Sequence, residues 1–104
     1  MKLVYSRRAL ADLNTIATYY TASASPAIAD AIGRRLDSVI DRICRAPEAA
    51  PRVSQRSHVR VVAVVRYPFR IFYRVRGETI DILHIRHTSK RPPAASTDMG
   101  SETS

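Results

Sequence analysis

The chain has 104 residues, one cysteine and a formal net charge of +8, with 17 Lys and Arg against 9 Asp and Glu. This length predicts a single domain, and a lone cysteine excludes an internal disulfide and a cluster of Cys metal ligands. The longest unbroken apolar run, residues 61–65, is far shorter than the roughly 20 residues of a membrane span, and no signal peptide is visible, so we expect a cytoplasmic protein.

The positive charge is concentrated in the second half of the chain. Residues 52–91 carry ten Lys and Arg against two Asp and Glu, whereas residues 1–51 carry seven against five. The last thirteen residues carry no basic residue and two acids. A basic block of this kind indicates a polyanionic partner, either nucleic acid or an acidic protein segment. The alternative is a solvated basic face that keeps the protein soluble.

The first half predicts a short strand followed by two helices. Residues 2–5 are the strand candidate, and Ser6 is suited to cap a helix over residues 7–22 because its hydroxyl accepts hydrogen bonds from first-turn amides. Ser25 and the proline after it begin a second helix that ends near residue 45, and the short connection predicts an antiparallel helical hairpin. The residues expected to face the core recur at helical spacing and are Ala9, Leu10, Leu13, Ile16, Ala17, Tyr20, Ile28, Ile32, Leu36, Val39, Ile40 and Ile43.

The second half predicts three strands. Residues 59–65 are β-branched and nearly continuous, which favours a strand covered on both faces. Tyr67 and Pro68 make the turn into the next strand, and Gly77 and Glu78 form a two-residue hairpin turn into the last. The middle strand places Phe69, Ile71, Tyr73 and Val75 on one face and Arg70, Phe72, Arg74 and Arg76 on the other.

The order of these elements predicts an α+β fold, β-α-α-β-β-β, in which the helical hairpin packs on one face of a mostly antiparallel sheet. The domain is expected to span residues 1–91. Residues 92–104 are small, polar and led by proline, so we expect a flexible C-terminal tail.

Among the side chains of the last two strands, those of arginine and histidine are suited to anion binding and to acid–base catalysis. A guanidinium donates a planar fork of hydrogen bonds to phosphate or carboxylate. His87 is the best placed general base, because histidine titrates near neutrality, although a polar strand end is the alternative. His84 is expected to share a strand face with Ile80 and Ile82 and to be partly buried there. The chain shows no Gly-rich phosphate loop and no Cys/His metal spacing, so no cofactor and no metal are expected.

Taken together, the helical hairpin, the strand YPFRIFYRV and the ending HIRHTSKRP resemble the RelE/ParE superfamily of toxins from bacterial type II toxin–antitoxin modules, over residues 2–91. The resemblance implies a toxin that a cognate antitoxin neutralises, the antitoxin being short and acidic with a DNA-binding N-terminal half. The pattern of Ala9, Asp12 and Leu13 and the Arg-rich ending look closer to ParE-like members. The best known of these act on DNA gyrase, which implies growth inhibition and a role in plasmid stabilisation.

RelE-like members are ribosome-dependent mRNA endonucleases, and this is the alternative function that the resemblance implies. The tyrosine usual near their C-terminal end is missing, because Thr88 follows His87 and no tyrosine follows Tyr73. The favoured hypothesis is therefore a ParE-like inhibitor that is not an enzyme, and a second alternative is an inactive relative that only binds antitoxin. Under the nuclease alternative the metal-independent catalytic set is Arg66, Arg70, Arg86 and His87. The surface expected to bind antitoxin or target comprises Arg60, Arg66, Arg70, Phe72, Arg74, Arg86, His87, Lys90 and Arg91.

Overall fold

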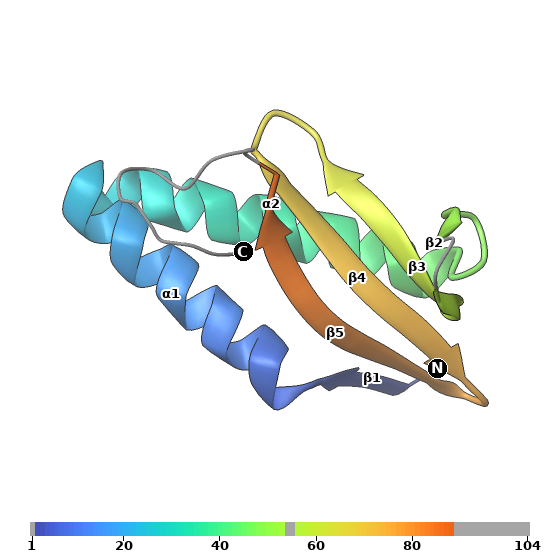
Figure 1. The fold of residues 1–104 in the computed structure, drawn as a ribbon. Helices are drawn as coiled ribbons and strands as arrows, with labels where there is room; N and C mark the ends of the chain where they lie inside the picture. Colours follow the sequence, from blue (N-terminus) through green and yellow to red (C-terminus); the bar gives the residue numbers. More distant parts are fainter. Residues whose placement is uncertain (1, 54–55, 89–104) are drawn as a thin grey trace.

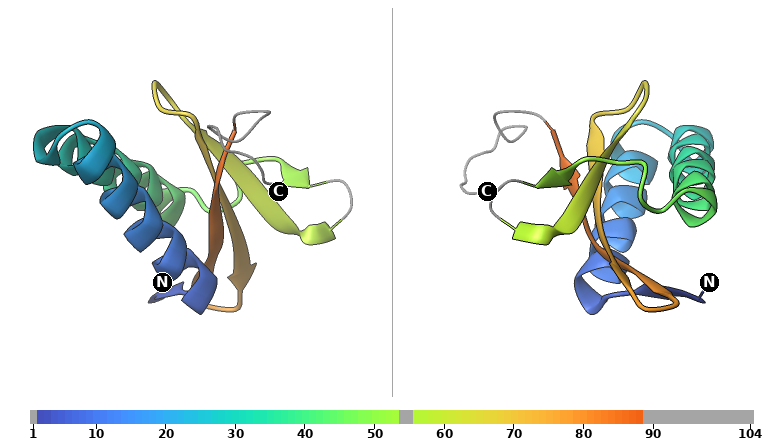
Figure 2. Two further views of the ribbon diagram at one scale, coloured as in Figure 1. Left: turned by 60° about the vertical axis from the view of Figure 1, so that its left-hand side comes forward. Right: turned by 90° about the vertical axis from the view of Figure 1, so that its right-hand side faces the viewer.

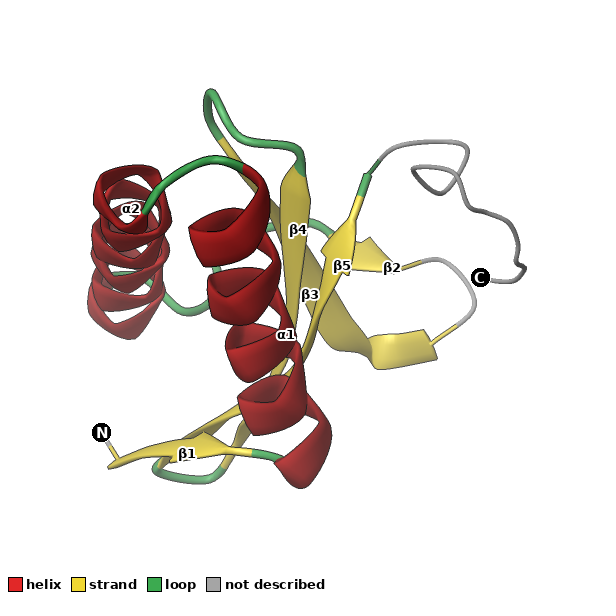
Figure 3. Cartoon of the chain, turned by 90° about the vertical axis from the view of Figure 1, so that its left-hand side faces the viewer, coloured by secondary structure: helices red, strands yellow, loops and turns green. Residues whose placement is uncertain are grey.

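The computed structural model describes residues 2–53 and 56–88, which form two helices and one five-stranded sheet. The elements are β1 (Lys2–Tyr5), α1 (Arg7–Ser23), α2 (Pro26–Arg45), β2 (Arg52–Val53), β3 (Arg56–Val64), β4 (Phe69–Arg76) and β5 (Thr79–His87). The strand order is β1-β5-β4-β3-β2, with β1 parallel to β5 and every other pair antiparallel. Both helices cover the same face of the sheet (Figure 1, Figure 3). The predicted α+β fold is confirmed, and the predicted tail lies outside the described residues.

Both helices begin at the predicted caps. Ser6 Oγ accepts a hydrogen bond from the amide of Ala9 at 2.9 Å, and Ser25 Oγ accepts one from the amide of Ile28 at 3.1 Å. Pro26 occupies the start of α2, where its missing N–H costs no intrahelical bond. These caps satisfy amides that the first helical turn leaves without a partner.

The core lies between the helices and strands β3, β4 and β5. On β4 the predicted alternation is confirmed, since Phe69, Ile71 and Tyr73 are at most 2% exposed whereas Arg70 and Arg76 are exposed. Each large apolar side chain buried in this way stabilises the fold by about 1.5–3 kcal/mol. The other buried apolar residues are Ala9, Ile32, Leu36, Val39, Ile40, Ile43, Val59, Val64, Ile80, Ile82 and Ile85.

Four expectations about burial are wrong, each because the helices and the sheet overlap only in part. Leu10 is 54% exposed and Ala17 is exposed, since both lie on the flank of the apolar stripe of α1 and only its centre meets the core. Ile28 is 47% exposed because it lies in the first turn of α2, where the helical hairpin extends past the sheet (Figure 1). The strand over residues 59–65 is not covered on both faces, since Ala63 and Val65 are exposed on a sheet that has helices on one side.

The connections agree with the predicted turns and add one strand. Gly77 has φ 60 in the two-residue turn between β4 and β5, a conformation that glycine adopts without strain. The segment expected to connect α2 to the sheet contains the two-residue strand β2, in which Arg52 pairs with Arg60 on β3.

Candidate binding surface

The face of the sheet away from the helices (Figure 2) is here called the outer face. The strand register places two rows of side chains on it, across β3, β4 and β5. One row contains Ala63, Arg70 and Arg86, and the next contains Val61, Phe72 and His84. Arg70 and Arg86 are exposed and directly opposite each other, and neither has a hydrogen-bond or ion-pair partner within residues 2–53 and 56–88. Like charges in this position destabilise a sheet, and an anion that bridges the two guanidiniums removes the repulsion.

Phe72 and His84 form a stacked pair beside these arginines, with ring centroids 4.4 Å apart and planes at 5°. The expectation that His84 shares a face with Ile82 is wrong. Tyr73 pairs with Ile82 and Phe72 pairs with His84, so Leu83 is an extra residue that makes a β-bulge in β5. Because the bulge reverses the alternation of the residues after it, His84 and Arg86 both lie on the outer face.

Helix α1 holds this bulge in place. Ser6 Oγ donates a hydrogen bond to the carbonyl of Leu83 at 2.6 Å, and Asp12 Oδ2 accepts one from the amide of Ile85 at 2.9 Å. A bulge leaves strand amides and carbonyls without ladder partners, and these two side chains satisfy them. The sequence offered one signal for Asp12, an acidic residue beside the predicted apolar stripe of α1.

Arg74, predicted to bind a partner, is part of an ion-pair cluster within the sheet. Its Nη2 lies 3.1 Å from Asp81 Oδ2, and Arg76 Nε lies 2.9 Å from the same oxygen. The hydrogen bond from Arg76, followed by the bond from Arg74, lowers the pKa of Asp81 against the opposing effect of burial. The Asp81 side chain is only 8% exposed and contacts both guanidiniums. Its negative charge therefore partly neutralises the two arginines at this end of the outer face.

Arg60, a second predicted binding residue, is engaged with the segment that follows α2. Its guanidinium donates to the carbonyls of Glu48 and Ala50, at 3.1 and 2.7 Å. Tyr73 donates its hydroxyl to the carbonyl of Pro47 at 2.6 Å, and burial raises the pKa of this phenol. These contacts fix the segment against the sheet, which gives Arg60 a structural role whatever else it binds.

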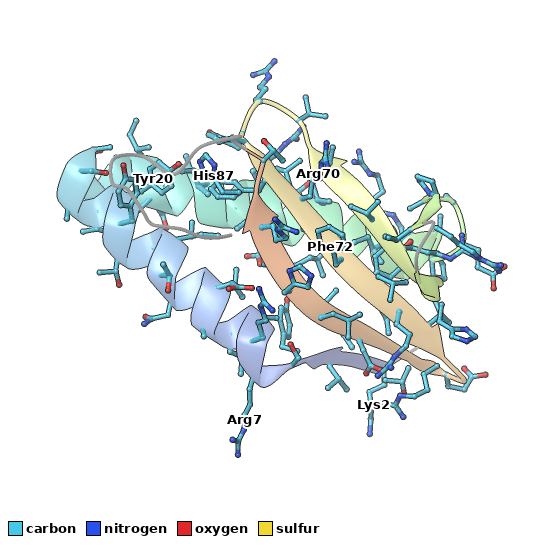
Figure 4. The ribbon with its side chains drawn as sticks, viewed as in Figure 1. Lys2, Arg7, Tyr20, Arg70, Phe72 and His87 are labelled. Carbon is cyan, nitrogen blue, oxygen red and sulfur yellow. The ribbon has the colours of Figure 1, made fainter. Side chains whose placement is uncertain are left out.

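His87 lies on the helix side of the sheet, not with Arg86 on the outer face. It pairs with Phe69 across the strands, and the two rings meet edge to face at 5.4 Å. Phe69 in turn contacts Tyr20 of α1 edge to face, with ring centroids 6.1 Å apart. Figure 4 shows Tyr20 and His87 on the same side of the molecule. Burial against these groups lowers the pKa of His87. Its register separates the histidine from the Arg70 and Arg86 row.

Of the remaining predicted residues, Arg66 lies at the end of the sheet where β3 turns into β4. Arg66 is exposed in that turn and has φ 79. Lys90 and Arg91 lie outside the described residues. The structure thus brings Arg70, Phe72 and Arg86 together, gives Arg60 and Arg74 internal partners, and places His87 on the other face.

An apolar groove that the sequence did not reveal runs between the C-terminal part of α2 and β3. It has a volume of about 630 Å³ and is lined by Val39, Ile43, Val61, Tyr73 and the small side chains of residues 46 and 49–51. Two arginines, Arg42 and Arg70, also line it, so the groove is continuous with the basic outer face. The only signal in the sequence was the run APEAAP, whose short side chains leave space beside the helix.

Within the described ranges no group of three or more His, Cys, Asp or Glu side chains is placed to hold a metal ion. None of the described helices is both long and apolar enough to cross a membrane.

Comparison with known proteins identifies the family. The model of the ParE toxin of the type II toxin–antitoxin system parDE matches residues 3–92. A chain of the chromosomal ParDE TA system from P. aeruginosa is similar in structure, with a TM-score of 0.77 and 29% identity over 86% of this chain and 97% of that one. The YoeB/ParE toxin from Agrobacterium tumefaciens shares the fold at a TM-score of 0.62, with 17% identity over 84% of this chain and 98% of its own. No curated protein sequence matches at a significant level. Because the family model covers nearly the whole described fold, the chain belongs to the ParE toxins of type II toxin–antitoxin systems, within the RelE/ParE superfamily.

Proposed function

We propose that this ParE-family toxin arrests growth by binding DNA gyrase in the cytoplasm and that a cognate antitoxin neutralises it by covering the outer face. Membership of the family supports the toxin role and implies an antitoxin partner. The similarity to a chain of the P. aeruginosa ParDE system, at 29% identity over most of both chains, supports the same kind of module.

The proposal that an antitoxin covers the outer face rests on the exposed pair of Arg70 and Arg86. This pair lies next to the stacked rings of Phe72 and His84. Two uncompensated guanidiniums attract carboxylates, and the neighbouring groove offers about 630 Å³ of mostly apolar space. A short acidic antitoxin segment with apolar side chains at intervals matches both features. Its apolar residues fill the groove while its carboxylates bridge the arginines.

The nuclease alternative has less support in the geometry. A general base must reach the 2′ hydroxyl while arginines hold the scissile phosphate. His87 is on the helix side of the sheet, and Arg70 and Arg86 are on the outer face. The missing C-terminal tyrosine weakens the alternative further.

Inducible expression with and without the antitoxin, followed by assays of the two targets, tests the proposal. We expect growth arrest without antitoxin, and purified toxin should inhibit supercoiling by gyrase and trap its cleaved DNA. Site-specific cuts in ribosome-bound mRNA that His87→Gln abolishes, with normal supercoiling, would replace gyrase by the ribosome. A toxin that is harmless on overexpression yet binds antitoxin would identify an inactive relative.

A further inference from the structure

A second basic site lies away from the outer face, between α2 and the turn from β3 to β4. It is a hollow of about 530 Å³, here called the turn hollow. Its polar lining comes from Arg34, Arg35 and Ser38 on the helix and from Arg66 and Tyr67 on the turn. No Asp or Glu is among the described residues that line it, so the hollow concentrates guanidinium and hydroxyl donors without an acceptor of opposite charge.

The charges that line the hollow are only partly compensated inside the protein. Arg34 forms an ion pair with Asp30 one turn earlier on the exposed side of α2. Arg35 is half-buried, and its Nε is fully buried with no hydrogen-bond partner in the described part of the chain. A buried donor without an acceptor is unfavourable, so the hydrogen-bonding capacity of the Arg35 guanidinium is not fully used inside the described part of the protein.

Arg66 has a backbone conformation that is unusual for its residue type. The amide of Tyr67 donates to the carbonyl of Val64 at 3.4 Å, which places Arg66 third in a β-turn, and its φ is 79. Glycine is favoured at that position because it has no Cβ to be strained there, and among the other residues asparagine tolerates the conformation best. An arginine kept in a strained turn at the edge of a basic hollow suggests a role for its side chain in binding.

We infer that the turn hollow binds a phosphodiester group of a nucleic-acid backbone. Guanidiniums on the helix and on the turn present planar forks to one volume, and Ser38 and Tyr67 add hydroxyl donors. A phosphate accepts on several oxygens at once and suits this set better than a single carboxylate does. The large positive charge of residues 52–91 adds long-range attraction for a polyanion. This binding goes beyond gyrase inhibition and antitoxin neutralisation and does not depend on either.

Fluorescence anisotropy with a short labelled DNA duplex, using the purified full chain at several salt concentrations, tests the inference. Arg35→Gln/Arg66→Gln removes two charges at the hollow. Arg7→Gln/Arg8→Gln, on the exposed first turn of α1, removes two charges elsewhere and is the matched control. We expect the hollow variant to bind at least about tenfold more weakly and to lower the slope of log K against log salt by about two, with a much smaller effect in the control.

Two competition experiments identify the source of the phosphate, and a second variant checks that weaker binding is not caused by misfolding. Single-stranded RNA of the same sequence competes with the duplex if RNA is the natural source, and inorganic phosphate at millimolar concentration competes if the phosphate group alone is recognised. Arg66→Gly removes the charge while relieving the strained turn, so it should stay folded, as circular dichroism will show, and still bind duplex more weakly. Absence of duplex and RNA binding by the wild type, equal losses in the hollow and control variants, or a loss of affinity for antitoxin alone would overturn the inference.

Discussion

Arg70 on β4 and Arg86 on β5 are direct cross-strand neighbours on the outer face, and both side chains are exposed. A sheet does not gain stability from two positive charges in that position. The pair therefore lowers the stability of the free toxin. Under the proposed docking of an acidic antitoxin segment, these two residues would couple antitoxin binding to toxin stability.

The first prediction concerns Arg86→Gln. Loss of one charge of the pair should raise the free energy of unfolding of the isolated toxin by about 0.2–1 kcal/mol, because the repulsion disappears. The affinity for antitoxin should fall about tenfold, the loss expected from a charged hydrogen bond. Urea unfolding and titration calorimetry measure the two effects, with Arg8→Gln as the control that changes neither. An unaltered antitoxin affinity would remove Arg86 from the interface.

The second prediction concerns Asp81→Asn, which breaks the cluster with Arg74 and Arg76. The free energy of unfolding should fall by about 2 kcal/mol at pH 7, because the buried carboxylate accepts charged hydrogen bonds from both arginines. Since the pKa of Asp81 is lowered in the folded state, its contribution is present above the ordinary value of 3.8 and is lost as the pH falls below it. Urea midpoints at pH 7, 5 and 3 should therefore converge between wild type and variant at low pH. A constant difference at all three values would contradict the assignment.

The third prediction concerns Asp12, whose Oδ2 accepts the amide hydrogen bond of Ile85 at the bulge. Asp12→Ala should lower the free energy of unfolding by about 1–3 kcal/mol, since a strand amide loses its acceptor. Asp12→Asn keeps an oxygen in the same place and is the matched control. Hydrogen exchange at Ile85 should speed up in the alanine variant and remain close to wild type in the asparagine variant. Equal exchange rates in both would exclude Asp12 as the acceptor.

The fourth prediction concerns His87→Gln. Because burial lowers the pKa of His87, the folded protein binds fewer protons than the unfolded chain near the ordinary value of 6.5. The wild type should therefore lose stability as the pH falls through that value, and the variant should lose less. Thermal midpoints between pH 8 and 5 measure this difference. Under the proposed gyrase inhibition the variant should still arrest growth, whereas a nuclease would become harmless.

Much of the fold was predictable because its signals are local. Ser6, Ser25 and Pro26 mark the helix starts through contacts within one turn, and two-residue periodicity identified the buried face of β4. For the candidate site, the sequence predicted which residue types it contains but not which face of the sheet each of them lies on. Alternation along β4 puts Arg70 and Phe72 on one face, but the same alternation along β5 placed His84 on the wrong face, and only the bulge brings Arg86 to the surface of Arg70.

The sequence by itself determined the order of the elements, their caps and turns, and the basic character of the sheet, since each depends on neighbouring residues. The tertiary structure decided which basic residues are available to a partner. The bulge at Leu83 depends on Ser6 and Asp12, more than seventy residues away in the chain, and it alone places Arg86 beside Arg70. The contacts of Arg60 likewise arise only when β3 meets the segment that follows α2. The cluster around Asp81 is more local, because the two-residue turn between β4 and β5 sets Arg74 opposite Asp81. Arg60 and Arg74 thus hold the fold together while Arg70 and Arg86 remain exposed. The bulge and the Arg60 contacts join separate elements of the folded chain, so no local pattern could have revealed them.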